Sequence, residues 1–241
     1  MRLKALIFDV DGTLAETEEA HRHAFNRAFA DAGHGWMWTP DLYRRLLQTT
    51  GGRERIATFL HSTGEELPAS EIAQLHRSKN EIYAQLVANG DVELRPGVSR
   101  LIEEAEAAGI ALAIATTTSF GNLCALLDRH FGESALARFG AVVTGEDVAA
   151  KKPDPAAYTR ALELLGLGPS TCLAIEDSRN GQIAAQRAGL AVLVTPSRYT
   201  DHEAFDGAAL VRENLDRPQP VTLADLEALL ASAQCEAAST R

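Results

Sequence analysis

Residues 3–13 read LKALIFDVDGT, a short apolar run that ends in two aspartates and a glycine. A near-continuous apolar run of this length is typical of a strand buried on both faces of a parallel sheet. Four similar runs follow along the chain, at 110–115, 141–144, 172–175 and 190–195. Each is preceded by a segment with helical spacing, at 98–108, 120–130, 155–165 and 180–188. This alternation predicts an α/β fold with a Rossmann-like, doubly wound parallel sheet at its core.

Residues 17–91 interrupt the alternation of strand and helix. They show only helical patterns, at 18–32, 41–47, 53–61 and 70–89. We therefore expect an inserted α-helical cap domain at 17–91, on a core formed by residues 1–16 and 92–241, with a closing helix at 222–233. Aromatic residues more often pack than bind ligands. We accordingly expect a small aromatic core within the cap, formed by Phe25, Phe29, Trp36, Trp38 and Phe59.

Composition narrows the classes of partner. A formal net charge of −10 argues against nucleic-acid binding, which depends on a basic surface, but it leaves room for a small anion held by a few local cations. Three cysteines are too few for a disulfide framework and favour a reducing compartment. We find no signal-peptide pattern and no apolar stretch long enough for a membrane helix, so a cytoplasmic protein is expected. The oligomeric state is left open, with a monomer as the working expectation.

Polar side chains stand where several predicted strands end. Asp9 and Asp11 follow the first strand, and at i and i+2 of an extended backbone their side chains point the same way. By itself such a pair is more often a polar turn. However, Thr116 follows the second strand, Lys152 precedes Pro153, and Glu176 and Asp177 end a later strand. Because ligands collect at the carboxyl ends of parallel strands, we expect these groups to converge on one site.

This four-part pattern resembles the haloacid dehalogenase superfamily, in the subgroup whose cap is inserted just after the first motif. The resemblance implies a phosphatase that works through an aspartyl-phosphate intermediate, with Asp9 as nucleophile and Asp11 as general acid and base. It also implies Mg²⁺ held by Asp9, the Asp11 main-chain carbonyl, Asp177 and Glu176, the last directly or through water. Thr116, the Thr117 amide and Lys152 would hold the phosphoryl oxygens. Dehalogenases of this superfamily lack the second aspartate, so Asp11 argues against that activity.

Two further segments bear on the substrate. Residues 49–55 read TTGGRER and place a glycine turn, with Gly52, beside Arg53, a suitable clamp for a distal phosphate. The second segment is rich in hydroxyls, of which one is expected to cap a helix and the others to suit a sugar; its residues are Thr117, Thr118, Ser119 and Asn122. Glu16 and His21 follow the catalytic loop and are expected to face the substrate. Both segments resemble the CbbY group, which implies hydrolysis of xylulose-1,5-bisphosphate, a Rubisco inhibitor, to xylulose 5-phosphate.

Three alternatives stay open on sequence alone. A phosphomutase related to β-phosphoglucomutase, or a phosphatase for phosphoglycolate or another sugar phosphate, would use the same catalytic residues. A phospho-accepting signalling receiver also gathers acids, a hydroxyl, a lysine and Mg²⁺ on a parallel sheet. Its phosphorylated aspartate normally ends a later strand and it has no cap, so the order of motifs disfavours it.

Overall fold

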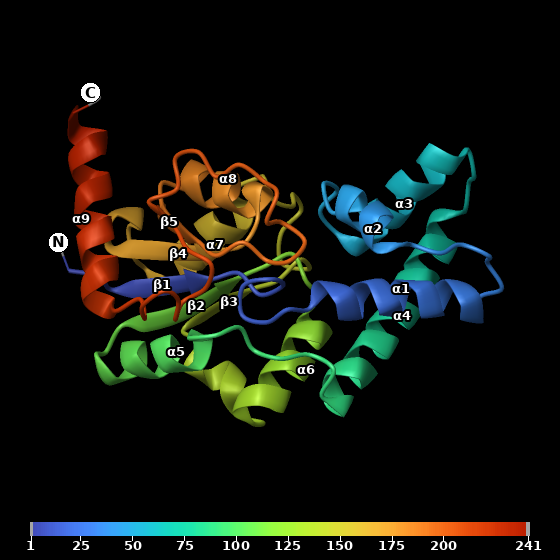
Figure 1. Cartoon of the computed structure of the whole chain (residues 1–241), viewed down its shortest axis with the longest axis horizontal. Helices are drawn as coiled ribbons and strands as arrows, with labels where there is room; N and C mark the ends of the chain where they lie inside the picture. Colours follow the sequence, from blue (N-terminus) through green and yellow to red (C-terminus); the bar gives the residue numbers. More distant parts are fainter. Residues whose placement is uncertain (1, 240–241) are drawn as a thin grey trace.

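A computed structural model describes residues 2–239 and shows a parallel sheet at the centre of the larger part of the molecule (Figure 1). Within those residues the sheet has six strands in the order β3-β2-β1-β4-β5-β6, and all neighbours are parallel. The strands are β1 (Ala5–Phe8), β2 (Ala111–Ala115), β3 (Ala141–Val143), β4 (Cys172–Glu176), β5 (Ala191–Val194) and β6 (Leu210–Val211). The expected doubly wound sheet is confirmed. Its sixth strand was not predicted, because two residues are too short to give a periodic signal.

Helices cover both faces of the sheet. In Figure 1, α5 (Val98–Ala107) and α6 (Phe120–Phe131) lie below it, and α7 (Ala156–Leu165) and α8 (Arg179–Arg187) lie above. The side chains of β1 alternate accordingly: Leu6 and Phe8 pack in the cluster of α5 and α6, and Ile7 packs in that of α7 and α8. Helix α9 (Leu223–Ser239) contacts α5, β4 and β5. Two short 3₁₀ turns, η1 (Ala135–Arg138) and η2 (Pro169–Thr171), complete the core.

Four helices stand beside the sheet, on the side opposite the chain termini (Figure 1). They are α1 (Glu18–Asp31), α2 (Pro40–Leu46), α3 (Gly52–Thr63) and α4 (Ala69–Asn89), each within two residues of the predicted range. Their own hydrophobic core contains Phe25, Phe29, Trp38 and Phe59, with Trp36 packed against it, so the packing role expected of these aromatics is confirmed. We propose residues 17–91 as one cap unit. Within residues 2–239, no helix is both long and apolar enough to cross a membrane.

Two chain segments connect the cap to the core and run side by side. Glu16 donates its amide to the Glu93 carbonyl, and the Arg95 amide donates to the Leu14 carbonyl. The buried Arg95 side chain donates to the carbonyls of Gly12 and Pro196 and pairs with Glu16. The connection is therefore anchored to the loop that carries the first two aspartates.

Candidate active site

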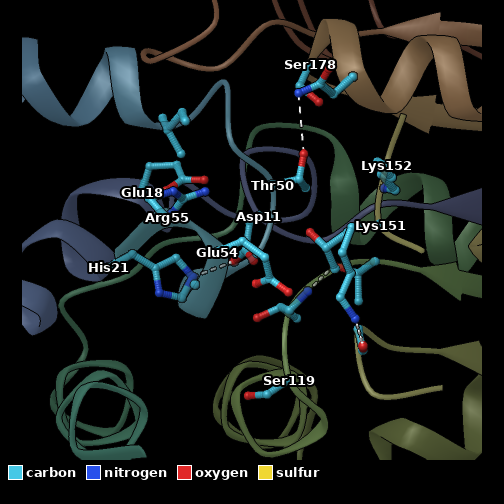
Figure 2. Close-up of a pocket in the computed structure, with 18 of the residues that line it drawn as sticks. Asp11, Glu18, His21, Thr50, Glu54, Arg55, Ser119, Lys151, Lys152 and Ser178 are labelled. Carbon is cyan, nitrogen blue, oxygen red and sulfur yellow. Dashed lines mark hydrogen bonds and ion pairs between the residues drawn. The ribbon is translucent and has the colours of Figure 1, made fainter. Parts of the chain in front are cut away.

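A cavity of about 370 Å³ lies between the cap and the carboxyl ends of the strands. The strand order reverses at β1, and ligands of open α/β sheets bind at such a switch point. The core contributes Asp9, Asp11, Thr116, Lys152 and Asp177 to the wall, and the cap contributes Arg53, Arg55, His76 and Lys79. Figure 2 shows Asp11, His21 and Arg55 on one side of this space and Lys151 and Lys152 on the other.

Three buried carboxylates meet at the ends of β1 and β4. Ligand oxygens of Asp9, Glu176 and Asp177 lie within 4.8 Å of one another. The buried Lys152 ammonium donates to Asp9 Oδ1 and to Glu176 Oε1, both at 2.6 Å. Three carboxylates against one ammonium leave two negative charges, and oxygen ligands are those that hard divalent cations prefer. The donor set therefore fits a divalent metal ion.

The pKa values of Asp9 and Asp177 are raised, because both are buried and too little positive charge lies near them. Burial raises the pKa of Asp9 to about 7, although Lys152 acts in the opposite direction. Burial, with the neighbouring charges of Asp9 and Glu176, raises the pKa of Asp177 well above its usual range. A carboxylate is ionised in such a place only when a cation compensates its lost hydration. A divalent cation that binds to the cluster would therefore displace protons from Asp9 and Asp177.

Two glycines make room for the acidic cluster. Gly12 has a φ of +80°, and a Cβ there would lie 2.6 Å from Cγ of Asp177. In α8, a Cβ on Gly181 would overlap the carboxylate of Glu176. The buried Tyr158 hydroxyl donates to Glu176 Oε1 at 2.5 Å, and the Asp177 amide approaches Glu176 Oε2 at 3.2 Å. Glu176 is thereby fixed on several sides, behind the cavity wall rather than in it.

Asp11 has partners of a different kind. Thr17 Oγ1 donates to Asp11 Oδ1 at 2.7 Å, and His21 Nε2 lies 2.9 Å from the same oxygen. Lys79 Nζ lies 2.7 Å from His21 Nδ1; when Lys79 is protonated it can only donate, so Nδ1 is the acceptor and Nε2 carries the proton that Asp11 accepts. Burial alone would raise the pKa of Asp11, but His21, Thr17 and Lys79 hold it well below its usual range. Asp11 is therefore an anion in this state, held by a neutral histidine, whose own pKa burial and Lys79 lower.

The hydroxyl-rich segment begins α6. Ser119 Oγ accepts from the Asn122 amide and caps the helix, so the expectation that one hydroxyl is a cap is confirmed. Thr116 and Thr117 line the cavity, and Thr116 Oγ1 accepts from the Thr118 amide at 3.2 Å. The side-chain amide of Asn122 donates through Nδ2 to Oδ1 of Asn80 in the cap at 3.1 Å. Part of this segment thus joins cap to core while the rest stays available to a ligand.

The cap side of the cavity carries more basic than acidic residues, the acids being Glu18 and Glu54. Gly52 is pressed against α4, because a Cβ on it would overlap the His76 ring. Arg53 follows it on the cavity wall, and Arg55, which also lines the cavity, donates to the Tyr43 hydroxyl at 3.0 Å. Burial lowers the pKa of Lys79 to about 7, partly offset by Asp11. Burial, together with Lys79 and Arg53, lowers the pKa of His76 to about 3.

Most residues expected at the site line this one cavity: Asp9, Asp11, His21, Gly52, Arg53, Thr116, Thr117, Thr118, Ser119, Asn122, Lys152 and Asp177. Glu16 does not; its carboxylate pairs with Arg95 at 3.1 Å, and Glu18 occupies the wall instead. Sequence reasoning missed Glu18, Arg55, His76 and Lys79. The spacing of His76 and Lys79 at i and i+3 on one helix face was the available signal, but it is also the spacing of an ordinary packing face.

Comparisons with known proteins agree with this geometry. Residues 3–189 match the haloacid dehalogenase-like hydrolase family. The chain is 51% identical to protein CbbY of Rhodobacter capsulatus over 208 residues, which is 86% of this chain and 92% of that protein.

Among solved structures, CbbY from Rhodobacter sphaeroides in complex with phosphate has 46% identity and a TM-score of 0.86. A CbbY variant from the same organism in complex with xylulose-1,5-bisphosphate has 46% identity and a TM-score of 0.88; each match covers 92% of this chain and 99% of the other. With the sheet, the cavity and the acidic cluster in place, the chain belongs to the haloacid dehalogenase-like hydrolase family.

Proposed function

We propose that this protein is a Mg²⁺-dependent phosphatase that hydrolyses a small sugar phosphate through a phosphorylated Asp9. The observation that carries the proposal is the buried cluster of Asp9, Glu176 and Asp177 around Lys152, beside Asp11 and at the wall of the cavity between cap and core. Phosphoryl transfer requires an in-line nucleophile, cations around the phosphoryl oxygens and a proton for the leaving group. All three requirements are met by residues of this one cavity.

Asp9, Asp177 and the Asp11 main-chain carbonyl would hold Mg²⁺, with Glu176 directly or through water. When bound, the ion would offset the repulsion between the Asp9 carboxylate and the phosphate dianion. Lys152 adds a fixed positive charge at Asp9 Oδ1, and Thr116 and the Thr117 amide offer donors to the phosphoryl oxygens. These groups would hold phosphate while its bonds change.

The chemistry runs in two displacements. An Asp9 oxygen attacks phosphorus and the ester oxygen leaves with a proton from Asp11; water then attacks the acyl phosphate after giving a proton back to Asp11. Asp11 is ionised in the free site, but a phosphate dianion beside it raises its pKa. His21 Nε2 lies 2.9 Å from Asp11 and can give it a proton as Nδ1 takes one from the Lys79 ammonium at 2.7 Å, so that His21 stays neutral. The products are the free sugar hydroxyl and inorganic phosphate.

The substrate we propose is a sugar bisphosphate, with xylulose-1,5-bisphosphate as the first candidate. Arg53 and Lys79 supply positive charge on the cap side of the cavity, away from the charges that the acidic cluster already pairs. A similar CbbY is known in complex with that ligand. Further proposed substrate contacts are His21, Gly52, Thr117, Thr118, Ser119 and Asn122, with Glu18 in place of Glu16. We place the enzyme in the cytoplasm, as a monomer.

A screen of phosphate release from sugar mono- and bisphosphates, with Mg²⁺ and with EDTA, tests the proposal. Wild type should release inorganic phosphate only with Mg²⁺, and Asp9→Asn should fold but release none. Phosphate release that survives either change would contradict the mechanism. A phosphomutase would convert a sugar phosphate into its isomer without net phosphate release, so product analysis separates this second candidate.

A further inference from the structure

The loop that follows β5 touches both the acidic cluster and the cap. We call residues 197–203 the rim loop. Thr200 and Glu203 line the cavity from the core side. Neighbouring side chains of the loop face different parts of the molecule, and the contacts on each side are specific hydrogen bonds.

On the core side, the rim loop holds Asp177. The Thr200 hydroxyl donates to the main-chain carbonyl of Asp177 at 2.7 Å and lies 3.3 Å from its Oδ2. The Ser197 amide donates to the same Thr200 hydroxyl at 2.9 Å, which fixes its direction. Thr200 and Ser197 are buried. The position of the Asp177 carboxylate therefore depends on where this loop lies.

On the cap side, Tyr199, the residue before Thr200, contacts two helices. The Tyr199 hydroxyl donates to Glu19 of α1, and its ring meets the edge of Tyr43 of α2 with centroids 5.5 Å apart. Arg44 of α2 donates to the Arg198 carbonyl at 3.0 Å. With these contacts, only 8% of the Tyr199 surface is exposed. A movement of the cap away from the core would pull on this residue directly.

Glu203, at the other end of the rim loop, also contacts both the core and the cap. Glu203 accepts from the Arg179 amide at the start of α8 at 2.6 Å, two residues after Asp177. It also accepts from Gln48 of the cap at 3.2 Å. Both ends of the rim loop thus connect the segment that carries Asp177 to the cap.

We infer that Tyr199 is a positioning residue that couples cap closure to divalent-metal binding through Thr200 and Asp177. The inference rests on the metal site of the proposed function. With the cap closed, Tyr199 keeps the rim loop in the position from which Thr200 holds Asp177. By linkage, metal binding then favours the closed cap to the same extent that closure favours metal binding.

The test is metal affinity in a variant that touches no metal ligand. Tyr199→Phe keeps the ring and removes only the hydroxyl that reaches Glu19. We expect its Mn²⁺ dissociation constant, measured from the electron paramagnetic resonance of free Mn²⁺, to be about fivefold or more above that of wild type. Asp31→Asn, at the exposed far end of α1, is the matched control and should bind Mn²⁺ as wild type does.

The cap offers a second readout. Both tryptophans, Trp36 and Trp38, belong to the cap, and Trp38 lies 5.9 Å from Tyr43 between ring centroids. Saturating Mn²⁺ should change the tryptophan fluorescence of wild type, because metal binding favours the closed cap. Saturating Mn²⁺ should leave the fluorescence of Tyr199→Phe unchanged. A double-mutant cycle completes the test: once Thr200→Val has released Asp177, adding Tyr199→Phe should cost no further affinity.

The outcomes separate the two proposals. If wild type binds no Mn²⁺, the metal site itself is wrong. If wild type binds Mn²⁺ and folded Tyr199→Phe binds it equally, the coupling is overturned while the metal site stands. Equal weakening in Asp31→Asn, or full additivity with Thr200→Val, would also overturn the coupling.

Discussion

A side chain is excluded at Gly12, beside the acidic cluster, by backbone conformation and by lack of space. Gly12→Ala introduces two separate costs. At a φ of +80° any residue with a Cβ is strained, by about 1–2 kcal/mol for the left-handed region. The new methyl group would also lie 2.6 Å from Cγ of Asp177 and 3.0 Å from Cβ of Ser197.

The second cost is the informative one. Carbon atoms in contact sit about 3.5–4.0 Å apart, so the Asp177 carboxylate must move by about 1 Å. A displacement of about 1 Å among groups that hold the reacting atoms lowers the rate on the order of 100-fold. We therefore expect Gly12→Ala to lose about 1–2 kcal/mol of unfolding free energy, about 100-fold in kcat/KM, and much of its Mg²⁺ affinity.

Gly33→Ala is the matched control, because Gly33 has a φ of +81° and a Cβ there meets nothing within 4 Å. It should lose similar unfolding free energy in urea titrations and keep kcat/KM and Mg²⁺ dependence. The difference between the two variants measures the clash with Asp177. Wild-type Mg²⁺ dependence and turnover in Gly12→Ala would refute the placement of Asp177 against the catalytic loop.

Two further predictions concern buried polar groups. Tyr158→Phe removes the donor that lies 2.5 Å from Glu176 Oε1, and urea unfolding should show a loss of about 1–3 kcal/mol; an unchanged unfolding free energy would mean that Glu176 does not depend on this bond. Lys79 has its pKa lowered to about 7 by burial, so its charge is mostly present at pH 6 and mostly lost at pH 8. KM for a sugar bisphosphate should therefore rise between pH 6 and pH 8 in wild type and stay constant in Lys79→Met. Arg77→Met, an exposed change on the same helix, is the control and should behave like wild type. A rise of KM that persists in Lys79→Met would contradict the role of Lys79.

Much of the fold was accessible from the sequence because its signals are local. Apolar runs such as 172–175 can satisfy their backbone and bury their side chains only as interior strands, and glycines such as Gly166 end helices through a left-handed residue. Strand β6 gave no signal because it is two residues long and half exposed. The helix expected to begin at Pro155 begins at Ala156, with Asp154 Oδ1 accepting from that residue's amide at 2.9 Å.

The residues proposed as catalytic could also be found in the sequence, because each stands at the end of a strand, and parallel strands bring their carboxyl ends to one edge. The groups that support them were not. Tyr158, Arg95 and Tyr199 look like ordinary core, linker and loop residues in the sequence. Glu16 and Glu18 both follow the loop that carries Asp9 and Asp11, and only the turn into α1 decides that Glu18 faces the cavity while Glu16 pairs with Arg95.

The sequence by itself therefore determined the parallel sheet, the inserted helices and the residues proposed to react, since short-range periodicity and strand ends encode them. The tertiary structure alone decided which buried charges pair, that Lys79 acts on Asp11 through His21, and that the rim loop spans Asp177 and the cap. The physical reason is that hydrogen bonds and ion pairs depend on ångström-scale distances between residues far apart in the chain, such as Tyr199 and Glu19. No local pattern of residues carries those distances.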